Sequence, residues 1–201
     1  MLKLWCAPGT ISVAVAIALE ETSQDWEARL LDFTAGEQRG ADYLARNPKG
    51  RVPLLETPEG DLTETGAILE YVAPDLVPPA PVAAARMRET MYYLASTMHV
   101  AHAHGRRGGR WADDPAALTA MAAKVPQTMT ECCTFLEEHL PLAPFAQGDT
   151  MTCADPYLFA VLRWCAGDGV DMTAFPKLSA FLAMMTARTS VAAVRERGLL
   201  P

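Results

Sequence analysis

The sequence predicts a small α/β domain followed by an all-α domain. Short apolar runs alternate with helical segments over the first 75 residues, a pattern typical of an α/β unit with a mixed sheet. A proline-rich segment follows at residues 74–81, with four prolines in eight residues, and it indicates an interdomain linker. Beyond it, every periodic segment is helical. We therefore expect one domain at residues 1–75 and a second at 82–201.

Each element of the first domain is marked by its own residues. The first strand ends at an Ala-Pro-Gly turn, and an Ala-rich helix follows, for which Thr10 or Ser12 is the natural cap. A short helix stops at Asn47-Pro48, Gly60 marks a hairpin turn, and Pro74 ends the last helix. The order is a strand at 2–6, a helix at 12–21, a strand at 26–32, a helix at 37–46, strands around 53–56 and 61–63, and a helix at 64–73.

The second domain is predicted to contain long helices. Gly105 and the Gly108-Gly109 pair are expected to break the first of them, and Pro126 to kink the second or divide it in two. The helices are expected at residues 82–104, 115–139, 154–166, 175–188 and 190–197.

Composition excludes several classes of protein. The chain of 201 residues has a formal net charge of -7, which gives no support to a nucleic-acid or membrane-surface protein. No window has about 18 uninterrupted apolar residues, so we expect no membrane span. The N-terminus has no signal-peptide pattern, and the five cysteines show no paired spacing. A reduced cytoplasmic protein fits these observations.

The most informative stretch runs from Asn47 to Ile68. Pro53 opens an apolar run, where proline is tolerated only at the start or edge of a strand. If the Val52-Pro53 bond is cis, the Val52 backbone turns outward and offers its N–H and C=O to a ligand. Glu64 and Thr65 then open a helix whose free N–H groups favour a carboxylate. A small ligand with a peptide backbone and a free carboxylate suits this site.

Four segments in this order resemble the cytosolic glutathione transferase family. Residues 47–53 are similar to its cis-proline segment, 63–68 to its acidic-hydroxyl helix start, 148–159 to its capping box, and 175–191 to its penultimate helix and following turn. In the capping box, Thr152 would be the N-cap and Asp155 the third helical residue. Residues 3–12 look most like the start of the bacterial beta class.

The resemblance implies a thioredoxin-like N-terminal domain that binds glutathione and an all-helical domain that shapes the pocket for a hydrophobic cosubstrate. It also implies a homodimer with its sites beside the subunit interface, and glutathione as a substrate with no further cofactor. By match, Val52, next to Pro53, pairs its backbone with the cysteinyl part of glutathione. Glu64 and Thr65 hold the γ-glutamyl end, and Arg51 meets the glycine carboxylate.

The catalytic position departs from the beta-class pattern. That class carries a cysteine where this chain has Ile11, so another group must stabilise the glutathione thiolate. Thr10 and Ser12 flank the position, and a hydroxyl at a helix N-terminus can donate to sulfur. Both residues are alternatively only helix caps. Cys6 is a further candidate, through a mixed disulfide with glutathione, although a cysteine at a strand end is usually inert packing.

The remaining candidates lie in the second domain. His99 matches a histidine that lines the beta-class active site, and a structural or surface role is its alternative. With His102 and His104 it does not form a convincing metal set, so we expect no metal. Tyr92, Met98 and Trp111 are the residues chosen for the cosubstrate wall. The basic stretch 106–111 is either a solvated loop or a region that steers anionic glutathione or an acidic cosubstrate.

The sequence thus predicts an enzyme that joins the glutathione thiolate to small electrophilic, hydrophobic compounds. Two alternatives stay open: glutathione-dependent thiol–disulfide exchange through Cys6, and a non-catalytic binding protein that keeps the fold. Expected partners are glutathione, an electrophilic small molecule and a second copy of the chain, with no nucleic acid and no membrane.

Overall fold

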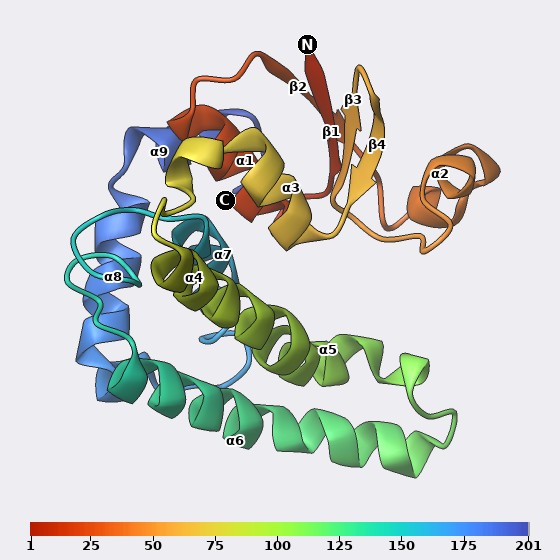
Figure 1. Ribbon diagram of the computed structural model, residues 1–201. Coiled ribbons are helices and arrows are strands. Elements are labelled where there is room, and N and C mark those ends of the chain that lie inside the picture. The colour runs from red at the N-terminus through yellow and green to blue at the C-terminus, as the bar shows by residue number, and fades with distance from the viewer. Residues whose placement is uncertain (201) are drawn as a thin grey trace.

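A four-stranded mixed sheet forms the first part of the molecule. The computed structural model describes residues 1–200, and its strands lie in the order β2-β1-β3-β4 (Figure 1). β1 pairs in parallel with β2 and antiparallel with β3, and β3 and β4 form the predicted hairpin. The strands are β1 (Leu2–Cys6), β2 (Trp26–Leu30), β3 (Leu54–Thr57) and β4 (Gly60–Thr63).

Helices cover both faces of this sheet. α1 (Ser12–Glu21) and α3 (Thr65–Val72) lie on the face toward the all-α part, and α2 (Ala41–Arg46) lies on the opposite side (Figure 1). The alternation along β1 explains this arrangement, because successive strand side chains point to opposite faces. Leu4 and Cys6 belong to the main core, whereas Trp5 packs against Tyr43 of α2, with 5.7 Å between ring centroids.

The rest of the described chain is helical, as predicted. α4 and α5 are joined by a π-helical turn at Leu94–Met98 into one rod. The predicted first helix is therefore present, but with a local change of winding. The helices are α4 (Pro81–Tyr93), α5 (His99–Arg107), α6 (Pro115–His139), α7 (Ala154–Leu162), α8 (Pro176–Thr186) and α9 (Thr189–Glu196). No helix within residues 1–200 is long and apolar enough to cross a membrane.

The predicted break at Gly105 and the predicted division at Pro126 are wrong, whereas the predicted break at the Gly108-Gly109 pair is confirmed. Gly105 lies inside α5, where its Cα faces Val125 of α6, so packing between the helices offsets the low helix propensity of glycine. Pro126 does not divide α6, which is one helix of 25 residues. Pro126 and Ala122 are both exposed, so water can hydrogen-bond the Ala122 carbonyl that loses its helical donor. α5 ends at Arg107, and the predicted Gly108-Gly109 pair begins a 3-10 turn at Gly108–Arg110.

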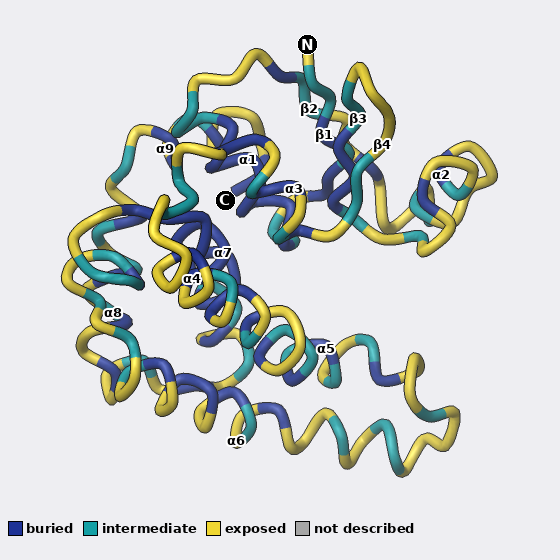
Figure 2. The backbone as a smooth tube through the Cα atoms, viewed as in Figure 1, coloured by how far each residue is buried: buried dark blue, intermediate teal, exposed yellow. Residues whose placement is uncertain are grey.

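α7 is the most completely buried helix of the described chain. All of its residues are buried, and it packs against α1, which is buried along most of its length (Figure 2). Thr152 and Asp155 are paired at its start as predicted, but the helix begins at Ala154, so Cys153 is the N-cap and Asp155 is the second helical residue. The Asp155 carboxylate accepts the Thr152 N–H at 2.7 Å and the Ala146 N–H at 2.7 Å, and the Thr152 hydroxyl oxygen accepts the Ala154 N–H at 3.3 Å.

Ion pairs join the helices of the two parts. Arg88 of α4 holds Glu70 of α3 through two hydrogen bonds of 2.8 and 2.7 Å. Arg188, just before α9, holds Glu21 of α1 in the same two-bond manner, at 2.6 and 2.8 Å. Such bidentate pairs fix orientation as well as distance. They therefore set how the sheet and the helical part meet.

The free energy of unfolding should depend strongly on the cap of α7. Replacing Asp155 with alanine leaves the buried N–H groups of Thr152 and Ala146 without acceptors, and we expect a loss of about 3 kcal/mol in the free energy of unfolding. Denaturant unfolding measures this change. Asp149→Ala, in the exposed loop just before the cap, is the matched control and should cost no more than about 0.5 kcal/mol. An equal loss in both variants would contradict the assigned importance of the cap.

Candidate functional site

The turn between β1 and α1 presents a helix N-terminus. Gly9 has a φ of 70°, which the turn needs and a side chain would disfavour, and its N–H donates to the Leu199 carbonyl at 3.0 Å. α1 begins at Ser12. The Ile11 N–H has no hydrogen-bond partner within residues 1–200. A free backbone donor therefore stands at the position where the beta-class pattern carries a cysteine.

Thr10 and Ser12 are in contact with each other but differ in exposure. The Thr10 hydroxyl lies 2.7 Å from the Ala7 carbonyl and 3.0 Å from the Ser12 hydroxyl. Because a carbonyl can only accept, Thr10 donates to Ala7 and Ser12 donates to Thr10. Thr10 is partly exposed, whereas Ser12 is fully buried. A ligand at the surface can therefore reach Thr10, and Ser12 acts only through it.

Cys6 is poorly suited to thiol chemistry. It is fully buried, and its Sγ lies 3.8 Å from the Arg29 carbonyl. Burial raises the pKa of the Cys6 thiol to about 12, with the contact to the Arg29 carbonyl acting in the opposite direction. At neutral pH, the thiolate needed for disulfide exchange is essentially absent.

The loop before β3 has the geometry expected from its sequence. The Val52-Pro53 bond is cis. The Arg51 carbonyl accepts the Tyr43 hydroxyl at 2.6 Å and the Asn47 side-chain amide at 2.6 Å, which ties the loop to the buried end of α2. The Val52 N–H and C=O have no hydrogen-bond partner in the described chain. They offer one donor and one acceptor to an extended peptide.

The start of α3 lies beside that peptide group. Glu64 has a φ of 71°, an uncommon backbone conformation for a residue other than glycine and one that clusters at functional sites. Its carboxylate is paired with Lys49 at 2.6 Å. Thr65 is buried, and it lies close to Tyr157 of α7. Residues from both halves of the chain therefore adjoin the positive end of α3.

Trp164 connects this region to α5. Its indole N–H donates to the Gly9 carbonyl at 2.9 Å, and its ring stacks on His102 with 4.3 Å between centroids. His102 is in turn fixed by Asp168, whose Oδ2 lies 2.7 Å from the histidine Nδ1. Trp164 and Asp168 belong to no sequence motif, so they were not predicted as site residues. Only the tertiary structure brings them to the β1–α1 turn.

His99 lies against the same tryptophan. The His99 and Trp164 ring centroids are 4.9 Å apart, and Arg107 lies 3.3 Å from the His99 Nε2. Burial lowers the pKa of His99 to about 3, and the positive charges of Arg107, His102, Arg110 and Arg51 act in the same direction. His99 is therefore neutral at physiological pH. In that form it can accept the Arg107 N–H.

A cavity of about 560 Å³ opens beside Thr10. Its wall includes Leu30, the last residue of β2, Leu31 and Phe33, which follow that strand, and Glu37. Leu30 is 52% exposed and Phe33 42% exposed, so an apolar surface adjoins the turn that carries Thr10. Such a concave and mostly apolar surface suits a small hydrophobic compound.

The structure brings some predicted site residues together and separates others. Arg51, Val52, Pro53, Glu64 and Thr65 lie on two adjoining segments, as described above. Met98 is fully buried in the core, and Tyr92 is 66% exposed at the end of α4. Trp111 contacts the ring of His104, at 4.6 Å between centroids. Of His99 and the three residues chosen for the cosubstrate wall, only His99 contacts the Trp164 ring. No group of three or more potential metal ligands occurs within the described residues.

Comparisons with known proteins agree with this geometry. The N-terminal domain family of glutathione S-transferases matches residues 1–74, and their C-terminal domain family matches residues 98–189. Glutathione S-transferase GST-4.5 of Xanthomonas campestris is 30% identical over 98% of this chain and 100% of its own.

Two solved structures are similar over nearly the whole chain. A glutathione transferase homologue from Sulfitobacter with bound glutathione is 53% identical, covers 100% of this chain and 99% of its own, and has a TM-score of 0.97. A bacterial beta-class enzyme from Sphingomonas chungbukensis is 32% identical over 98% of this chain and 99% of its own, with a TM-score of 0.83.

The low pKa of His99 has a consequence for stability. The unfolded chain protonates this histidine near pH 6.5, whereas the folded protein resists protonation until about pH 3, so stability is lost as the pH falls below 6.5. Between pH 7 and pH 5, the wild type should lose about 2 kcal/mol more than His99→Gln, which keeps an acceptor but cannot titrate. Denaturant unfolding at both pH values measures the difference. His139→Gln, at an exposed histidine of α6, should follow the wild type; a parallel loss in His99→Gln would refute the assignment.

Proposed function

Since this chain belongs to the glutathione S-transferase family and is a glutathione transferase, we propose that it joins the glutathione thiolate to small electrophilic, hydrophobic compounds. The observation that carries the proposal is the free Val52 peptide group beside the N-terminus of α3. One end of that site suits a peptide backbone and the other suits a carboxylate. Glutathione has both features.

The proposed binding mode follows from the groups that are free. The Val52 N–H and C=O pair with the cysteinyl residue of glutathione, as one strand pairs with another. Its γ-glutamyl carboxylate lies at the start of α3, where Thr65 and the helix dipole favour a negative charge. Its glycine carboxylate lies toward Arg51. In this orientation the sulfur points toward the β1–α1 turn.

Thiol activation is assigned to the N-terminus of α1 in place of a cysteine. The Ile11 N–H is free to donate to the thiolate, and the Thr10 hydroxyl can turn from the Ala7 carbonyl to the more strongly accepting sulfur. Ser12 keeps its hydrogen bond to the Thr10 oxygen and so positions it. The thiolate then attacks an electrophile held in the apolar cavity beside Thr10, where proximity adds to the rate.

The two alternatives have less support. Disulfide exchange through Cys6 is opposed by the burial and the raised pKa of that thiol. A docking protein without activity would not need a free donor at Ile11 next to an open cavity. We further propose that residues 1–75 bind glutathione and residues 82–201 shape the cosubstrate pocket. The homodimer, the cytoplasmic location and the use of glutathione as a substrate without a further cofactor stay predictions.

Replacing Thr10 with valine tests the hydroxyl. The variant keeps the shape but loses the donor, so the pKa of bound glutathione should rise by about one unit or more, and kcat/KM for 1-chloro-2,4-dinitrobenzene should fall about tenfold. The thiolate absorbance of the enzyme–glutathione complex, followed against pH, gives the first value. Steady-state conjugation gives the second.

Thr10→Ser is the matched control, because it keeps the hydroxyl, and it should retain most of the activity. A Thr10→Val variant with unchanged thiol pKa and turnover would refute the hydroxyl mechanism and leave the Ile11 N–H as the activating group. Calorimetry with glutathione serves a separate purpose: undetectable binding to the wild type would overturn the proposed function itself.

A further inference from the structure

Four arginines from both parts of the chain gather beside the proposed glutathione site. Arg39 and Arg51 belong to the segments around α2, and Arg107 and Arg110 to the end of α5 and the turn after it. Burial and the charges of Arg110 and Arg51 lower the pKa of Arg107. Burial and the charges of Arg51 and Arg39 do the same for Arg110. The positive charges of Arg51 and Arg110 thus act on Arg107, and that of Arg39 acts on Arg110.

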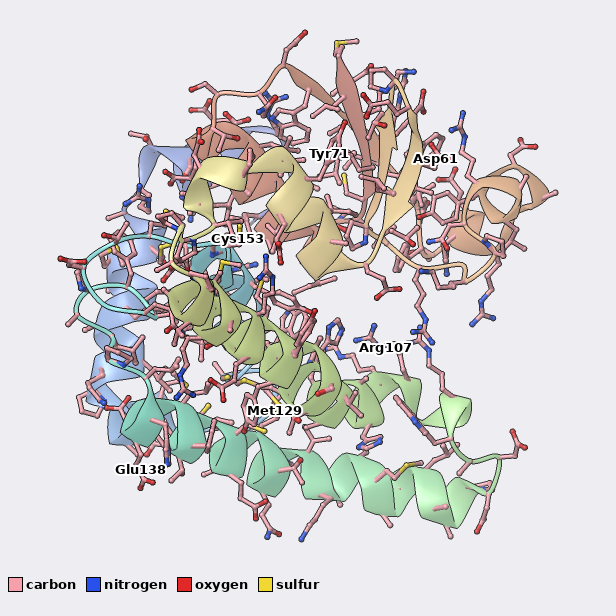
Figure 3. The ribbon with its side chains drawn as sticks, viewed as in Figure 1. Asp61, Tyr71, Arg107, Met129, Glu138 and Cys153 are labelled. Atoms are coloured by element: carbon pink, nitrogen blue, oxygen red, sulfur yellow. The ribbon has the colours of Figure 1, made fainter. Side chains whose placement is uncertain are left out.

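These arginines have no counterion in residues 1–200. The ion pairs of the described chain involve other basic residues, such as Arg88 and Arg188. The Arg107 side chain is half-buried, and its polar contact within the described residues is with the neutral His99 ring (Figure 3). Arg39, Arg51 and Arg110 are exposed. The half-buried charge of Arg107 without a partner costs free energy, which a bound anion offsets.

The arginines also lie near the reacting atoms. The carbonyl of Gly9, next to Thr10, accepts the Trp164 N–H at 2.9 Å. The Trp164 ring contacts His99, whose Nε2 is 3.3 Å from Arg107. On the other side, Arg51 directly precedes Val52, the proposed partner of the glutathione backbone. Arg107 and Arg51 thus border the space between the β1–α1 turn and the Val52 loop. That is where the second substrate must approach the sulfur.

Glutathione alone supplies too little negative charge for this cluster. Its γ-glutamyl carboxylate is assigned to the start of α3, which leaves one glycine carboxylate for four arginines. Resting on the proposed function, we infer that the second substrate is an electrophile bearing a carboxylate, which Arg107 and Arg110 bind while its apolar body lies toward the cavity beside Thr10. Guanidinium groups suit this purpose, since each can hold a carboxylate through two hydrogen bonds.

A matched pair of electrophiles tests the inference. With 4-chloro-3-nitrobenzoate, the thiolate attacks the carbon that carries chlorine, a C–S bond forms, the C–Cl bond breaks, and chloride leaves with the bonding electrons. The thiol proton goes to solvent. Its methyl ester reacts in the same way but has no charge. The ratio of kcat/KM for the acid to that for the ester is measured at saturating glutathione, and comparing this ratio between variants cancels the difference in intrinsic reactivity.

Arg107→Met should lower the acid-to-ester ratio about tenfold or more, and Arg110→Met several-fold, because each removes a charge-assisted contact to the carboxylate. Arg107→Lys, which keeps the charge but loses the planar fork, should fall between the wild type and Arg107→Met. Arg106→Met is the matched control, since Arg106 is an exposed neighbour on α5 that does not belong to the cluster, and its ratio should equal that of the wild type. An unchanged ratio in Arg107→Met and Arg110→Met would overturn the inference.

A binding measurement separates this inference from the proposed function. Unreactive 3-nitrobenzoate is titrated calorimetrically into the full-length protein with and without saturating S-methylglutathione. We expect it to bind in both cases and to bind about tenfold more weakly to Arg107→Met. Binding only in the absence of S-methylglutathione would mean that the arginines serve the glycine carboxylate alone, which overturns the inference. Failure of S-methylglutathione itself to bind would instead overturn the proposed function, and 3-nitrobenzoate alone would still report on the arginine site.

Discussion

The packing of α1 against α7 is the constraint on which the rest of this structure depends. Both helices are buried along nearly their whole length, one belongs to the sheet side and the other to the helical side, and they cross where the two parts meet. The N-terminus of α1 carries the proposed thiolate donors. The segment that follows α7 supplies Trp164, which holds the Gly9 carbonyl immediately before them. Burial of apolar surface has no preferred direction. Here it nevertheless fixes the position of the proposed thiolate donors, whose hydrogen bonds depend on direction.

This arrangement explains how a chain without the beta-class cysteine can still favour a thiolate. A helix N-terminus already provides partial positive charge and unpaired N–H groups. Ile11 places such an N–H at the vacant position, and Thr10 adds a hydroxyl that is held by Ser12. A thiol of the protein itself is not needed for this chemistry. The only nearby thiol described here, that of Cys6, points into the core.

The positive charges of the molecule are unevenly distributed, and its net charge does not show this. The chain carries a formal charge of -7, yet four of its arginines gather at one border of the site without acidic partners. Elsewhere, arginines such as Arg88 and Arg188 are matched by carboxylates and serve to join the two parts. The same residue type thus has two uses here. The paired arginines stabilise the fold, and the unpaired ones form the proposed binding site for an anion.

The sequence by itself determined the order of elements, the cis-proline loop, the start of α3 and the Thr152–Asp155 cap, because each depends on residues close together in the chain. Turn chemistry, proline and capping act within a few residues, so a local pattern suffices. Local rules failed at Gly105 and Pro126, where packing between helices and solvation of the backbone decided the outcome.

Only the tertiary structure decided which of the hydroxyls is exposed and that Met98 lies in the core. It also decided that Trp164 contacts the β1–α1 turn, with His99 against Trp164 and Arg107 against His99. Those residues come from distant parts of the chain, and their contacts arise from the packing of whole helices, which no short motif records.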